Sequence, residues 1–166
     1  MRRTANRTAN RRTLPAVELP TVAATGQLGR RLAARLPADP SGWMILLQGE
    51  LGSGKSTLAR ALLHALGHKG PVPSPTYTLV EPYVLSGSVI YHFDLYRIVE
   101  PEDLELIGIR DYVDGRAICL VEWPERGSDF LAVPDLLVTI RQQDHARELE
   151  VSARTAAGED ALAELK

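Results

Sequence analysis

A glycine-rich segment at residues 49–56 carries residue types that bind phosphate. It reads Gly-Glu-Leu-Gly-Ser-Gly-Lys-Ser and fits the pattern G-x-x-x-x-G-K-[ST]. Gly49, Gly52 and Gly54 let the backbone fold around an anion with its N–H groups turned inward, where a Cβ would collide. In this pattern the backbone and the lysine contact phosphates, and the hydroxyl that follows ligates Mg²⁺. The segment therefore predicts a site for ATP and Mg²⁺.

The predicted contacts extend through the whole loop and into the helix expected after it. The N-terminus of that helix adds roughly half a positive charge near the anion. Lys55 is expected to reach the β- and γ-phosphates as a point charge, Ser56 to bind Mg²⁺, and Thr57 to add a phosphate contact. The nucleotide contacts predicted in this segment are Glu50, Leu51, Gly52, Ser53, Gly54, Lys55, Ser56 and Thr57.

Two acidic residues each follow an apolar stretch, as expected of a carboxylate beside a metal site. Asp94 follows residues 88–93, and Glu122 follows residues 117–121. Strand ends form the ligand edge of α/β sheets, and a carboxylate there holds Mg²⁺ directly or through water. One acid is predicted to ligate the metal, and the other to orient the attacking water or support a switch. Alternation places His92 on the face of Asp94, where a structural role is favoured over a catalytic one.

A buried strand and a helix must position the loop. The continuous apolar run at residues 43–48 is typical of a strand buried on both faces. Residues 56–66 predict a helix that is closed by Gly67. Ahead of the strand, leucines spaced four apart predict an amphipathic helix at residues 27–36, with Thr25 as its N-cap.

Further elements alternate along the rest of the chain. Residues 77–83 and 88–96 predict two strands joined by a turn at 86–88, after a proline-rich loop. The apolar run at 117–123 predicts a strand interior to the sheet, in which Trp123 is favoured as a core residue. The remaining expectations are a short acidic helix at 101–106, a closing pair of edge strands at 136–141 and 147–153, and a loose helical tail at 158–166. Buried strands alternating with helices indicate a three-layer α/β domain.

The composition is that of an ordinary globular protein with one domain. The chain has 166 residues, of which 45% are hydrophobic and 24% charged. No apolar run is long enough to span a bilayer, so no membrane association is expected. The single cysteine, Cys119, cannot form an intrachain disulfide, which favours a cytoplasmic location.

The charge is unevenly distributed. Residues 1–12 contain five arginines and no acid, so the rest has 14 basic and 21 acidic side chains, or −7. A body this acidic is a poor unaided binder of nucleic acid. Residues 1–13 are predicted to be a disordered basic extension, with an RNA-contacting arm or a transit peptide as alternatives. The domain is expected at 14–155 and a C-terminal tail at 156–166.

Four ordered motifs give the chain a resemblance to a known family. They are the loop at 49–57, Ser-Pro-Thr-Tyr-Thr-Leu-Val-Glu-Pro-Tyr at 74–83, His-Phe-Asp-Leu-Tyr-Arg at 92–97 and Val-Glu-Trp-Pro at 121–124. The chain resembles the TsaE family across about residues 15–155. The resemblance implies an α/β, three-layer P-loop NTPase-like domain with a mixed, largely parallel central sheet. It also implies a slow ATPase that supports the threonylcarbamoyladenosine modification of tRNA.

The resemblance also implies roles for individual residues and for partners. Ser56 and Glu122 would ligate Mg²⁺, and Asp94, with Lys55, would be catalytic. The 74–76 segment would act as a switch facing the γ-phosphate, with Thr76 as its contact. Thr25 would lie close to the nucleotide. The implied partners are the TsaB and TsaD proteins, with tRNA reached indirectly through their complex.

Rival classes of nucleotide-binding protein predict different features. A GTPase would need N-K-x-D, yet both asparagines, Asn6 and Asn10, precede the loop, and no D-x-x-G follows it. A small-molecule kinase of the P-loop class is the main alternative, but it would carry an arginine-rich lid. Arg141 and Arg147 are isolated and fall in predicted strands. A non-enzymatic, ATP-dependent adaptor overlaps with the favoured interpretation.

Overall fold

One mixed sheet organises the part of the chain that the computed structural model describes, which is residues 12–85, 87–143, 146–163 and 165. Within those residues the sheet has seven strands in the order β1-β7-β6-β2-β5-β4-β3. The strands are β1 (Val17–Leu19), β2 (Met44–Gly49), β3 (Val80–Leu85), β4 (Ser88–Asp94), β5 (Ile118–Glu122), β6 (Leu136–Gln143) and β7 (Ala146–Ala153).

Parallel pairing is confined to the centre of the sheet. β2 pairs in parallel with both β5 and β6, and β5 pairs in parallel with β4. The outer pairs β1–β7, β6–β7 and β3–β4 are antiparallel. The sheet is therefore mixed, as predicted, but less parallel than expected. The reason is that the β3–β4 and β6–β7 connections are too short for a crossover, which parallel neighbours require.

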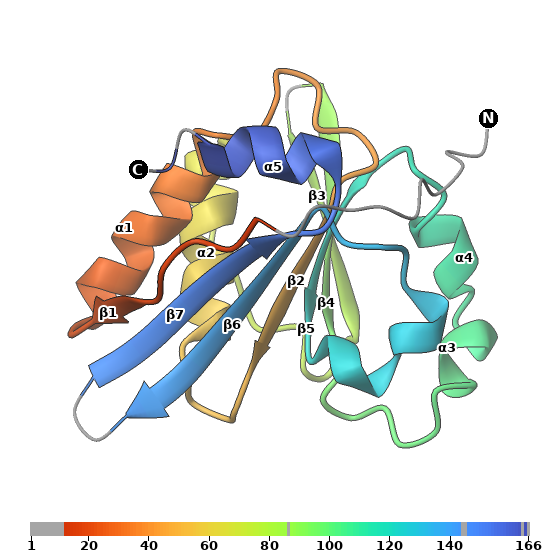
Figure 1. The fold of residues 1–166 in the computed structure, drawn as a ribbon. Helices are drawn as coiled ribbons and strands as arrows, with labels where there is room; N and C mark the ends of the chain where they lie inside the picture. The colour runs from red at the N-terminus through yellow and green to blue at the C-terminus, as the bar shows by residue number, and fades with distance from the viewer. Residues whose placement is uncertain (1–11, 86, 144–145, 164, 166) are drawn as a thin grey trace.

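Helices lie on both faces of the sheet (Figure 1). α1 (Val22–Ala33) and α2 (Lys55–Ala65) pack side by side on one face, and the short α3 (Asp103–Leu106) and α4 (Ile109–Tyr112) lie on the other. Two 3₁₀ turns follow β5, and α5 (Ala156–Ala163) follows β7.

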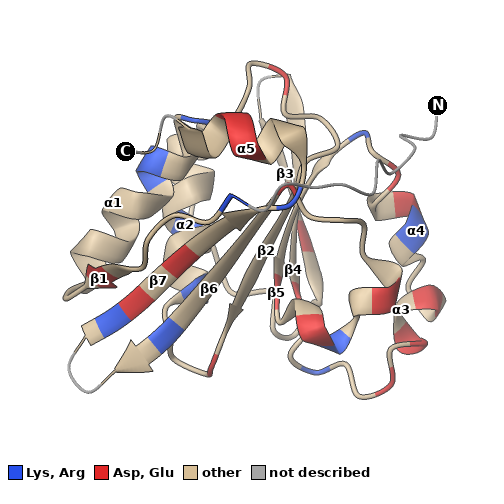
Figure 2. Ribbon diagram, viewed as in Figure 1, with Lys and Arg blue, Asp and Glu red and all other residues tan. Residues whose placement is uncertain are grey.

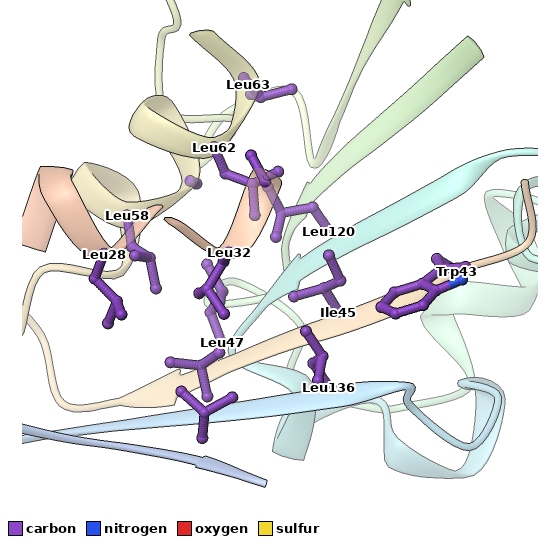
Figure 3. Close-up of a cluster of buried hydrophobic side chains, with 14 of the residues drawn as sticks. Leu28, Leu32, Trp43, Ile45, Leu47, Leu58, Leu62, Leu63, Leu120 and Leu136 are labelled. Carbon is purple, nitrogen blue, oxygen red and sulfur yellow. The ribbon is translucent and has the colours of Figure 1, made fainter. Parts of the chain in front are cut away.

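The side chains of β2 divide between two apolar clusters on opposite faces of the sheet. Ile45 and Leu47 join the cluster that includes α1 and α2, whereas Met44 and Leu46 join the other. Figure 3 shows Leu32 and Leu62, from those two helices, over this strand. Because successive strand residues point to opposite faces, burial on both sides requires an unbroken apolar run. The predicted buried strand at 43–48 is confirmed.

The first helix begins earlier than predicted. Thr21 is its N-cap, because the Thr21 Oγ1 accepts a hydrogen bond from Ala24 N at 3.1 Å. Thr25 instead lies one turn inside the helix, is fully buried, and donates from Oγ1 to Thr21 O at 3.4 Å. The prediction of Thr25 as the N-cap is wrong, since both threonines offer the same hydroxyl and only Thr21 precedes the helical backbone.

Two boundaries in the sheet also differ from the prediction. β3 begins at Val80, because residues 77–79 form a turn in which Leu79 N donates to Pro75 O at 2.7 Å. β1 was not predicted, and it pairs outside β7. The 136–141 and 147–153 strands therefore lie inside the sheet at this side and not at its edge.

The two ends of the described chain are packed against the domain. Ala153 N donates to Arg12 O at 2.9 Å and Thr13 forms a bridge with Ser152, so these residues of the predicted extension are ordered. Residues 1–11 lie outside the described part. Leu162 in α5 is fully buried in the apolar cluster that includes α1 and α2. The tail is helical, as predicted, but it is not loose, because its apolar side chains pack into the core.

The predicted acidic helix forms a short turn with a solvent-exposed face. Glu102, Asp103 and Glu105 are exposed, while Leu104 is fully buried. In Figure 2 the red segments of the ribbon, which mark Asp and Glu, lie on and around α3. Among the described residues, no helix combines the length and the apolar character that a membrane crossing needs.

Cys119 is expected to be unreactive in the folded protein. It is buried in β5, and this burial raises the pKa of the thiol to about 12, with Asp114 adding to the effect. At pH 8 only roughly one thiol in 10⁴ would be ionised, and the thiolate is the reactive form. We expect negligible reaction with an aromatic disulfide reagent until denaturant is added, followed by one equivalent per chain. Full labelling of the native protein within minutes would contradict this prediction.

Candidate functional site

A pocket lies where the carboxyl ends of the central strands meet. Asp94 ends β4 and pairs with Glu122 at the end of β5, which lies beside β2. The loop that follows β2 completes the wall. The pocket has a volume of about 340 Å³, and it is lined by Leu51, Gly52, Gly54, Lys55, Ser56, Thr57, Ser74, Thr76, Asp94, Tyr96, Glu122, Trp123 and Arg147. Most of the predicted site residues therefore come together.

The backbone of the glycine-rich loop is arranged as an anion cradle. Gly52 and Gly54 have φ of 76° and 111°, a region in which side chains are strained. A Cβ on Gly49 would lie 2.5 Å from Ile140 O, so this position also excludes a side chain. The backbone bonds of α2 begin with Leu58 N donating to Gly54 O. The N–H groups of the first helical turn have no partner within the helix, so they are available to an anion at the loop.

The ammonium group of Lys55 is held inside the loop. Its Nζ donates to Gly49 O and Glu50 O, each at 2.7 Å, and lies 4.0 Å from the centroid of the Trp123 ring. Burial lowers the pKa of Lys55, while the nearby Glu122 carboxylate opposes this shift. Two carbonyl oxygens and the face of an aromatic ring are therefore the partners of the Lys55 ammonium group.

Trp123 lines the pocket and also packs, partly buried, against the apolar cluster that contains Met44 and Leu46. The sequence favoured a core position because the residue continues an apolar strand. Its backbone turns out of β5 with φ of 58°, which is uncommon for a residue with a side chain. This turn brings the half-buried ring over Lys55 and within 5.0 Å of the Tyr96 ring. Left-handed backbone of this kind concentrates at functional sites.

Ser56 and Glu122 form an oxygen-rich pair at the base of the pocket. The Ser56 hydroxyl donates to Glu122 Oε2 at 3.0 Å, and Glu122 Oε1 lies 2.9 Å from His92 Nε2. A hydroxyl and a carboxylate are donors that suit Mg²⁺, which binds proteins through one or two carboxylates and completes its shell with phosphates and water. No group of three or more His, Cys, Asp or Glu residues in the described chain could hold a metal by itself. The donor set fits Mg²⁺ shared with a phosphate.

Asp94 ties the 74–76 loop to the sheet. Its Oδ2 accepts hydrogen bonds from Thr76 Oγ1 at 2.7 Å and Ser74 Oγ at 3.3 Å. Its Oδ1 accepts from Tyr96 N at 2.9 Å. The carboxylate is buried, yet it borders the pocket. These bonds hold the proline-rich segment at the same pocket that the glycine-rich loop lines.

Three predicted contacts do not line the pocket. Ser53 is fully buried, with its Oγ 3.5 Å from Lys55 Nζ, so it supports the loop from within. Glu50 lies on the exposed outer side and contributes its carbonyl oxygen to Lys55. Thr25 lies behind the loop, where its methyl carbon is 3.8 Å from the place a Cβ on Gly54 would occupy.

Tyr96 and Arg147 line the pocket although the sequence alone assigned neither residue to the site. Tyr96 follows Asp94 by two residues, and that proximity was a usable signal. Arg147 carries no local signal, because β7 reaches the pocket from more than 90 residues beyond the loop. Its Nε is buried, lies close to Gly54, and has no hydrogen-bond partner among the described residues. The pocket thus contains a second cation besides Lys55.

The fold and the site define a class: a mixed α/β protein with a glycine-rich loop, followed by a helix, at the carboxyl edge of its parallel strands. The family model described as threonylcarbamoyl adenosine biosynthesis protein TsaE matches residues 19–150. The chain belongs to the TsaE family.

Individual relatives agree with this assignment. The tRNA threonylcarbamoyladenosine biosynthesis protein TsaE of Haemophilus influenzae is 51% identical over 119 residues, covering 72% of this chain and 75% of the relative. The protein of the same name from Bacillus subtilis is 35% identical over 114 residues, covering 68% and 70%. The crystal structure of Bacillus subtilis YdiB superimposes with a TM-score of 0.77 at 25% identity, covering 95% of this chain and 97% of that one.

Proposed function

We propose that this protein is a P-loop ATPase that supports the threonylcarbamoyladenosine modification of tRNA by acting on a complex of TsaB and TsaD. The observation that carries the proposal is that one pocket brings together the glycine-rich loop, the Ser56–Glu122 pair and the hydrogen bond from Thr76 to Asp94. Membership of the TsaE family supports the pathway. The cytoplasm is the proposed location.

The loop and its cations bind the phosphates in this proposal. The N–H groups at the start of α2 donate to phosphate oxygens, and Lys55 leaves its carbonyl partners to neutralise their charge. Arg147 approaches from β7 and contributes its unpartnered Nε–H. Ser56 and Glu122 hold Mg²⁺, which when bound neutralises the charge that develops on the β- and γ-phosphates.

Asp94 and Thr76 supply the hydrolytic and switching parts. Asp94 borders the pocket as a buried carboxylate, placed to orient a water molecule or accept its proton. Thr76 can donate its hydroxyl either to Asp94, as here, or to a γ-phosphate. Exchange between these two acceptors would move the 74–76 loop with the state of the nucleotide.

The partners are expected to make the contacts with tRNA. Excluding residues 1–12, the chain carries a formal charge of −7. A polyanion such as tRNA binds to clustered cations, and a body with this charge repels it. ATP hydrolysis here would therefore act through the protein partners.

An ATPase assay with and without the partner pair tests the proposal. We expect slow phosphate release from ATP, several-fold stimulation by TsaB with TsaD, and little activity with GTP, because the chain lacks a guanine-recognition motif. A small-molecule kinase would instead release little phosphate without an acceptor. No phosphate release from ATP in the presence of Mg²⁺ and both partners would contradict the proposal.

A further inference from the structure

His92 is a buried polar residue to which the proposed function assigns no role. It lies in β4 with 1% of its surface exposed, on the sheet face that packs against α1 and α2. Its register partner in β5 is Leu120, and Glu122 lies two residues further on the same face. A leucine would fill an apolar position of this kind without a polar atom to satisfy. The imidazole is therefore explained by its one polar contact, Glu122.

The contact between His92 and Glu122 fixes one oxygen of the carboxylate. A carboxylate that ligates Mg²⁺ only accepts hydrogen bonds, so in the proposed site the His92 Nε2 carries the proton and donates it to Glu122 Oε1, which lies 2.9 Å away. His92 Nδ1 has no partner among the described residues. Glu122 Oε2 accepts from Ser56 Oγ instead. Each carboxylate oxygen thus has a different partner, one inside the sheet and one at the pocket.

Building on the proposed function, we propose that His92 is a positioning residue that makes Glu122 a one-oxygen ligand and thereby favours Mg²⁺ over larger cations. While Oε1 is held by Nε2–H, only Oε2 is free to turn from Ser56 towards a metal. Mg²⁺ requires near-octahedral geometry, whereas Ca²⁺ accepts bidentate carboxylates and irregular shells. Hydrogen bonds to metal ligands commonly set ligand orientation and metal affinity in this way.

Competitive metal binding tests this role without relying on turnover. Mn²⁺ binding would be followed by electron paramagnetic resonance in the presence of a non-hydrolysable ATP analogue, with Mg²⁺ and Ca²⁺ as competitors. In His92→Asn, whose shorter amide cannot reach Glu122, we expect Mg²⁺ affinity to fall about 10- to 100-fold. Ca²⁺ affinity should change less than about three-fold, since Ca²⁺ can bind both oxygens of a Glu122 carboxylate that His92 no longer orients. His92→Gln places an amide N–H near the position of Nε2 and should restore the preference for Mg²⁺.

Control variants separate the proposal from its alternatives. His64→Asn and His64→Gln make the same changes at an exposed histidine of α2 and should leave both affinities unchanged. Melting temperature and metal-free nucleotide affinity report folding of each variant. An unchanged Mg²⁺-to-Ca²⁺ ratio in His92→Asn, or an equal loss in a folded His92→Gln, would overturn the inference. If instead Glu122→Ala matches the wild-type protein in metal affinity, the metal site of the proposed function is wrong.

Discussion

Replacing Asp94 by asparagine is expected to lower ATP hydrolysis by about 10²- to 10⁴-fold while leaving ATP affinity within about three-fold. The carboxylate borders the pocket and holds the 74–76 loop through Thr76 and Ser74. Asparagine has nearly the same shape, and its one oxygen can accept from Thr76 and Ser74, while its NH2 group replaces the oxygen that accepts from Tyr96 N. The loop should therefore stay in place, and the loss should come from the missing charge and base.

Single-turnover hydrolysis and equilibrium binding of a non-hydrolysable analogue measure the two effects separately. Ser74→Ala is the matched control, because it removes the 3.3 Å contact with Asp94 and the 2.8 Å contact with Thr76 Oγ1 but leaves the carboxylate and its bond from Thr76 intact. We expect it to retain hydrolysis within about five-fold, since a single neutral hydroxyl hydrogen bond contributes only about 1 kcal/mol to stability and Thr76 still holds the loop. Hydrolysis by Asp94→Asn at the wild-type rate would remove Asp94 from the chemistry and leave it as an anchor of the loop.

Local sequence patterns were sufficient for the centre of the fold and the base of the site. The β2 run is apolar on both faces because the sheet is covered on both sides, and the glycine spacing follows from the backbone angles that the loop requires. Asp94 and Glu122 could be placed together because parallel strands end at one edge. In each case the signal lies within about ten residues of the group it positions.

Tertiary contacts decided the features that the sequence did not show. β1 has only three residues and forms because β7 offers it an edge. Trp123 leaves the strand through a left-handed turn before Pro124, which no apolar pattern indicates. Thr21 and Thr25 are interchangeable as cap residues until the packing of the helix fixes where it begins. Arg147 depends on the register of β7 against β6 and β1.

The two cations of the pocket are in different states. Lys55 already has carbonyl oxygens and an aromatic ring as partners, so in the proposed function it would have to exchange them for phosphate. Arg147 has a buried Nε–H with no partner among the described residues, and such a group gains a whole hydrogen bond when an anion enters. We therefore expect Arg147 to contribute to nucleotide affinity, although it lies far from the glycine-rich loop in the sequence.

Replacing Arg147 by alanine is expected to weaken ATP binding about 10- to 100-fold, or about 1.4–2.7 kcal/mol, the range of a hydrogen bond to a charged group. Isothermal titration with a non-hydrolysable analogue measures the change, and the difference from wild type should shrink as salt rises. Arg141→Ala is the matched control, because Arg141 is exposed on the neighbouring strand and does not line the pocket. Arg147→Lys keeps the charge but not the Nε–H and should recover only part of the affinity. Equal affinities for the Arg147→Ala and Arg141→Ala variants, with unchanged melting temperatures, would show that Arg147 packs against the loop without binding the nucleotide.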